Sequence, residues 1–78
     1  MLPSSKDLSR FYAELAKSKS NPDEMTTHLD KALDSLQRLY TPASGATFSA
    51  GVSAYARSAG ISYETALIQA SIPPLKTL

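Results

Sequence analysis

The chain has 78 residues, of which 42% are hydrophobic and 19% charged, and its formal net charge is +1 at pH 7. This favours one folded domain over residues 1–78 and excludes a strongly basic nucleic-acid-binding arm. The absence of cysteine excludes disulfides and thiolate chemistry, and a single histidine does not make an ordinary zinc site. With no signal-peptide core and no membrane-length apolar segment, we expect a soluble cytoplasmic protein without a cofactor.

The first predicted helix spans about residues 6–18. Its apolar side chains recur at the i, i+3, i+4, i+7 spacing of one helix face, namely Leu8, Phe11, Tyr12 and Leu15. Ser4 and Asp7 have the spacing of a capping box, with Asp in place of Glu. We therefore expect an amphipathic helix that packs through this stripe.

The second predicted helix spans about residues 22–40 and has the clearest start signal in the chain. Asn21 is a good N-cap, Pro22 suits the first helical position, and Glu24 has the spacing of a capping box. The single histidine, His28, lies on this helix. We expect it to be a solvated or partly packed helix residue.

A heptad-like seam runs along the second helix: Met25, Leu29, Ala32, Leu36 and Leu39, widened by Leu33 and Tyr40. Two interpretations remain open. The seam is either the face that packs on the chain's own core or the interface of a homodimer. Only about two heptads are present, fewer than a coiled coil usually needs.

Residues 41–47, with Pro42 and Gly45, are predicted to be a flexible joint before a third helix at about 48–59. The apolar side chains of this helix gather on one side: Phe48, Val52, Tyr55, Ala56 and Ala59. Gly51 lies inside the helix, where glycine is unfavourable, so it predicts a close helix crossing.

Gly60 is expected to end the third helix with a positive φ, and Ser62 to cap a fourth helix over about 62–71. Ile61 and Ala66 have the spacing of a hydrophobic staple, and Pro73 and Pro74 prevent a longer helix. No strand pattern competes with these segments. The predicted fold class is all-α, a small four-helix domain with a C-terminal corner like a helix-turn-helix.

The sequence around Gly60 follows the outline Ala-x-x-Ala-Gly-Val-Ser-x-x-Thr, matched by Ala56, Ala59, Gly60, Ile61, Ser62 and Thr65. About residues 52–71 thus resemble the helix-turn-helix of bacterial DNA-binding proteins of the lactose-repressor type. The resemblance implies a transcription regulator whose second motif helix enters the major groove of double-stranded DNA. Ser62, Tyr63 and Glu64 would then approach base edges, and Arg57 would contact phosphate.

Both the facing of the fourth helix and the function remain open. Gln69 stands where the family has an inward apolar residue, and a facing with Ile61, Thr65, Ile68 and Ile72 inward fits the hydrophobic pattern better. The alternative function is a protein-binding inhibitor or adaptor that uses an apolar surface of Tyr63, Leu67 and Ile68. Neither reading is enzymatic, because the glycines are isolated and no catalytic set accompanies His28.

Overall fold

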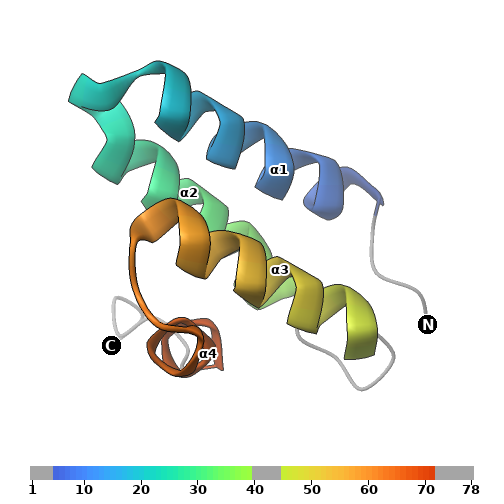
Figure 1. Cartoon of the computed structure of the whole chain (residues 1–78). Helices are drawn as coiled ribbons and strands as arrows, with labels where there is room; N and C mark the ends of the chain where they lie inside the picture. The colour runs from blue at the N-terminus through green and yellow to red at the C-terminus, as the bar shows by residue number, and fades with distance from the viewer. Residues whose placement is uncertain (1–4, 40–44, 72–78) are drawn as a thin grey trace, which may run out of the picture.

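The computed structural model describes residues 5–39 and 45–71 (Figure 1). These form four α-helices, a short 3-10 helix and no strand: α1 (Ser5–Ser20), η1 (Pro22–Glu24), α2 (Met25–Arg38), α3 (Gly45–Ala59) and α4 (Tyr63–Ser71). The predicted all-α fold is confirmed.

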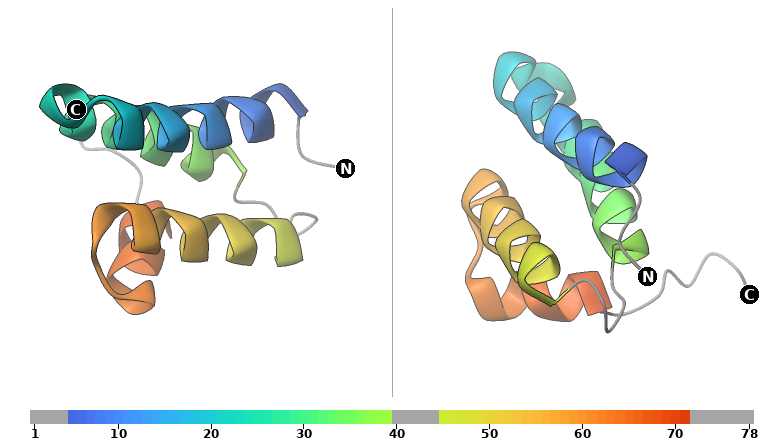
Figure 2. Two further views of the ribbon diagram at one scale, coloured as in Figure 1. Left: turned by 45° about the horizontal axis from the view of Figure 1, so that its top comes forward. Right: turned by 90° about the vertical axis from the view of Figure 1, so that its right-hand side faces the viewer.

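The helices α1 and α2 form an antiparallel hairpin, and α3 lies beside it, antiparallel to α2 (Figure 1). The last helix, α4, crosses α2 and α3 transversely and contacts both (Figure 2). Three helices therefore run side by side, and α4 covers one side of the α2–α3 pair.

The core draws on all four α-helices. Its buried apolar side chains are Phe11, Leu15, Ala32, Leu36, Leu39, Phe48, Val52, Tyr55, Ala56, Ala66 and Ala70. Five apolar residues were predicted on one side of α3. Four of them are buried, as predicted, namely Phe48, Val52, Tyr55 and Ala56, and Ala59 is partly buried. Because four of the eleven core residues are alanines, the helices can approach one another closely.

The α1 helix runs further than predicted, through Ser20. Its last turn satisfies carbonyls locally: the Ser18 hydroxyl donates to the Leu15 carbonyl at 2.6 Å, and the Ser20 hydroxyl donates to the Ala16 carbonyl at 3.1 Å. Lys17 and Lys19 also favour the negative end of the helix dipole. The polar residues at the end of α1 therefore support its last turn.

The predicted capping box at Asn21 is wrong. The Asn21 side chain makes no cap hydrogen bond to the following helix. Its amide instead donates to the Lys17 carbonyl at 3.1 Å, so it closes the end of α1. Pro22–Glu24 form η1, and α2 starts at Met25, because the chain must reverse direction before α2 can pack on α1.

The buried face of α1 also differs from the predicted stripe. Phe11 and Leu15 are buried and Leu8 is partly buried, but Tyr12 is exposed and packs edge-to-face on Phe11 with ring centroids 4.9 Å apart. Glu14 and Ser18 are buried in its place. Ser4, which we predicted to cap this helix, lies outside the described residues.

The seam of α2 packs largely within the chain itself. Ala32, Leu36 and Leu39 are buried in the core, and Leu29 is partly buried. Of the seam residues only Met25, 40% exposed, reaches the surface. Between the two interpretations of the seam, this burial favours packing on the chain's own core. Tyr40 lies outside the described residues.

The α3 helix begins at Gly45, earlier than predicted, so residues 45–47 of the expected joint are helical. Residues 41–44 of that joint lie outside the described residues. The close crossing expected at Gly51 is confirmed, because a Cβ there would meet Leu36 Cδ1 at 2.8 Å and Phe11 Cε2 at 3.6 Å. Glycine is required at this position because helices α1, α2 and α3 meet there.

A larger residue at this crossing should destabilise the protein. Gly51→Val should lower the free energy of unfolding by about 2 kcal/mol, because overpacking a filled core outweighs the gain in helix propensity. Ala50→Val, at an exposed position of the same helix, should change it by less than about 0.5 kcal/mol. Urea denaturation of both variants measures the difference, and equal effects would contradict a close crossing.

Candidate functional site

The bend between α3 and α4 has the local geometry expected from its sequence. Gly60 has a φ of 70°, the only positive value among the described residues. The Ile61 N–H donates to the Ala56 carbonyl at 3.0 Å, which closes the end of α3 as in a Schellman motif. The Ser62 hydroxyl oxygen accepts the Thr65 N–H at 3.1 Å and so caps α4.

The α4 helix packs inward through Ala66 and Ala70, both buried. The alternative facing is wrong, because Thr65 is exposed and Ile68 is 59% exposed. Its fourth residue, Ile72, lies outside the described residues. Leu67 packs beside these two alanines and is partly buried against the core. The Gln37 amide of α2 also donates to the Gln69 carbonyl at 3.1 Å.

This facing leaves the residues predicted to contact DNA at the surface. Ser62, Tyr63 and Glu64 are exposed at the start of α4, and Arg57 is exposed in the last turn of α3. The Ser62 hydroxyl also donates to Thr65 Oγ1 at 2.9 Å. Its hydrogen is therefore engaged within the cap, while Tyr63 and Glu64 face solvent.

A second cation lies beside Arg57. Lys19 of α1 and Arg57 of α3 line one hollow of about 290 Å³ together with Ala54 and Ser58. Neither cation makes an ion pair in the described part of the chain. Lys19 was not predicted as a site residue, because nothing in the sequence signals that the end of α1 lies near the end of α3.

The apolar surface predicted for a protein partner is divided. Leu67 is partly buried against the core, whereas Tyr63 and Ile68 are exposed. Five helical positions separate Tyr63 from Ile68, so they point about 140° apart around the axis of α4. The three residues do not form one continuous apolar face.

A buried hydrogen bond joins α1 to α2. His28 Nδ1 lies 2.8 Å from Glu14 Oε1, and both side chains are about nine-tenths buried. His28 Nε2 lies 3.5 Å from the exposed Glu24 carboxylate. The expectation of a solvated or partly packed histidine is wrong, because the hairpin places Glu14 opposite it.

This hydrogen bond holds the pKa of Glu14 below its ordinary value of 4.5, against the opposing effect of burial; the charge of Lys17 contributes less. An ionised carboxylate only accepts hydrogen bonds, so Nδ1 of His28 carries the hydrogen. The pair is therefore a charge-assisted hydrogen bond inside the helical hairpin.

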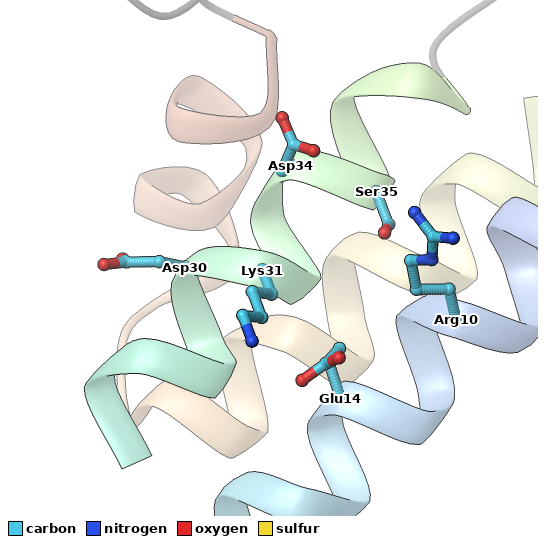
Figure 3. A pocket seen from close by; sticks show the side chains of 6 residues that line it. All are labelled: Arg10, Glu14, Asp30, Lys31, Asp34 and Ser35. Carbon is cyan, nitrogen blue, oxygen red and sulfur yellow. The ribbon is translucent and has the colours of Figure 1, made fainter. Parts of the chain in front are cut away.

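A groove between α1 and α2 forms the larger hollow, of about 520 Å³. It is lined by Arg10, Glu14, Asp30, Lys31, Asp34 and Ser35 (Figure 3). Two of its carboxylates have partners elsewhere: Glu14 bonds His28, and Asp34 pairs with Arg38 at 3.0 Å. The groove thus combines two paired acids, a third acid, Asp30, and two cations.

The described residues contain neither a metal-ligand cluster nor a membrane-length apolar helix. Over residues 5–39 and 45–71, no group of three or more His, Cys, Asp or Glu side chains is arranged to hold a metal ion. None of the helices described combines the length and the apolar character that crossing a membrane requires.

Comparison of the chain with protein-family models, curated proteins and solved structures finds no match. The functional conclusion therefore depends on the geometry of the α3–α4 bend and of the α1–α2 groove.

The effect of a substitution at Gly60 should come from the backbone conformation alone, since a Cβ there would have no neighbour within 4 Å. Gly60→Ala should lower the free energy of unfolding by about 1 kcal/mol, because a left-handed conformation is unfavourable for alanine. Gly60→Asn should cost less. Gly45→Ala, equally open but without a positive φ, should cost nothing in urea denaturation; equal losses at both glycines would contradict this account.

The Glu14–His28 hydrogen bond predicts acid sensitivity. Because the pKa of Glu14 is lower in the folded state, its contribution to stability is complete above about pH 4.5 and is lost as the pH falls through the folded value. Urea unfolding from pH 5 downward should show a shallower loss for Glu14→Gln and for His28→Leu than for wild type.

Lys17→Gln is the matched control, since Lys17 is a weaker cause of the lowered pKa than His28. It should change the pH dependence less than His28→Leu does. A His28→Leu protein with the wild-type pH dependence would contradict the assignment.

Proposed function

We propose that the protein is a small DNA-binding regulator that contacts duplex DNA through the start of α4 and the end of α3. The main support is the facing of α4. Its inner face is made by Ala66 and Ala70, so Tyr63 and Glu64 remain exposed in its first turn. A helix that reads DNA needs its first turn free to enter the major groove.

In this proposal the residues have separate roles. Tyr63 and Glu64 face base edges, and Glu64 accepts a hydrogen bond from a cytosine amino group. Ser62 fixes the start of α4, since its hydroxyl is engaged with Thr65. Arg57 contacts phosphate, as the resemblance to repressor motifs implies, and Lys19 joins it as a second phosphate contact from α1.

In this proposal one copy of the chain binds each site on DNA. A dimer through the α2 seam would need Ala32, Leu36 and Leu39, which the chain's own helices already cover. With few cations available, we expect weak binding at physiological salt. The net charge of +1 agrees with a small number of phosphate contacts.

Titration with a short mixed-sequence duplex tests the proposal. Binding should be measurable near 50 mM salt and fall steeply toward roughly 200 mM. The double variant Lys19→Gln/Arg57→Gln should bind more weakly and reduce the slope of log affinity against log salt by about 2, one for each lost phosphate contact. Tyr63→Ala should weaken binding without changing that slope.

The matched control is Arg10→Gln/Lys31→Gln, which removes the same charge from the α1–α2 groove. It should keep the wild-type salt slope. No binding at low salt would overturn the proposal, and an equal loss with both double variants would overturn the assigned surface. In the absence of DNA binding, retention of a partner protein by wild type but not by Ile68→Asp would support the protein-binding alternative.

A further inference from the structure

The α1–α2 groove contains a buried polar atom without a partner. The Ser35 side chain is 1% exposed, and its hydroxyl oxygen makes no hydrogen bond within the described residues. Ser35 of α2 and Arg10 of α1 both line the groove (Figure 3). Buried hydroxyls are normally hydrogen-bonded because an unmet donor is costly. The groove therefore holds a donor without an acceptor.

Two cations line the same groove from opposite helices. Arg10 of α1 and Lys31 of α2 are both exposed, and neither has an ion pair within 4.0 Å in the described part of the chain. The nearby carboxylates of Glu14 and Asp34 are held by His28 and Arg38 instead. The groove thus offers three hydrogen-bonding groups. The guanidinium and the ammonium can only donate, and the Ser35 hydroxyl lacks an acceptor.

We propose that this groove binds a small molecule through an oxyanion group, with Arg10 and Lys31 as its charged contacts and Ser35 as a hydrogen-bond donor. A phosphate group suits the set better than a carboxylate, because its additional oxygen can meet the ammonium or the hydroxyl while the guanidinium fork holds two others. The site is separate from the proposed DNA contact and does not depend on it.

The acidic residues of the groove limit the ligand to a small one. Asp30 and Asp34 line the same hollow. The pKa of Tyr55 is raised above 10.0, mainly by burial and in smaller part by the charge of Asp30. The charge of Asp30 therefore also acts on a core residue. Their negative charges disfavour an extended polyanion such as DNA, whereas a hollow of about 520 Å³ accommodates a small phosphorylated molecule.

Binding requires a small movement of the side chains that line the groove. The Ser35 oxygen has almost no exposed surface in the free protein. An anion held by Arg10 and Lys31 must therefore displace a covering side chain before the Ser35 hydroxyl can donate to it. Arg10 and Lys31 are exposed, long side chains, so a change of their rotamers meets no packing barrier.

NMR titration of the ¹⁵N-labelled full chain with inorganic phosphate, at an ionic strength held constant with sodium chloride, tests the site. Amide signals of Arg10, Lys31 and Ser35 should shift and saturate. Arg10→Gln/Lys31→Gln should weaken binding by about tenfold or more, and Ser35→Ala by a smaller factor. Acetate, titrated in the same way, should bind more weakly than phosphate.

The matched control is Lys19→Gln/Arg57→Gln, which should leave phosphate binding in the groove unchanged. Shifts without saturation, or saturable shifts centred on Lys19 and Arg57, would overturn the proposal. Phosphate binding unaltered by Ser35→Ala would overturn the role of the hydroxyl, and acetate binding as strong as phosphate would overturn the preference for phosphate. Each variant's amide spectrum confirms that it is folded before titration.

Discussion

The structure depends on the close approach of three helices at Gly51. Leu36 of α2 and Phe11 of α1 occupy the space that a Cβ of Gly51 would need. The missing side chain sets the distance between α3 and the α1–α2 hairpin. The fourth helix, α4, then packs on α2 and α3 through Ala66 and Ala70, both buried, and through Leu67, which is partly buried.

A polar contact complements this apolar one within the hairpin. The Glu14–His28 hydrogen bond lies between α1 and α2, where most side chains in contact are apolar. Burying a charged group is costly unless it is hydrogen-bonded, so any register of the hairpin that separated the two side chains would leave the carboxylate unsatisfied. The pair therefore favours one register of α1 on α2, which apolar packing alone specifies less strongly.

The two candidate surfaces differ in charge and in shape. The α3–α4 bend presents the first turn of α4. Arg57, in the last turn of α3, lines a smaller hollow with Lys19 of α1, and neither cation has an ion pair among the described residues. The α1–α2 groove is larger and mixes two cations with acids that are mostly engaged elsewhere. We propose duplex DNA as the ligand of the first surface and a small anion as the ligand of the second. Each combines side chains from two different helices.

By itself the sequence determined the helices and the bend at Gly60. These are local features: apolar periodicity, the positive φ that glycine allows, and the Ser62 cap all act within a few residues. Tertiary structure decided which side of each helix is buried. Tyr12 is exposed and Glu14 is buried, because Glu14 meets a hydrogen-bond partner, His28, on the facing helix.

Tertiary structure also decided the composition of both surfaces. Lys19 joins Arg57, and Arg10 joins Lys31 and Ser35, only after the helices pack. Periodicity within one helix reports its amphipathic face but not which side chain of another helix lies opposite. For that reason the sequence alone indicated the first turn of α4 as a contact surface, while its neighbouring cations and the α1–α2 groove emerged only from the packed structure.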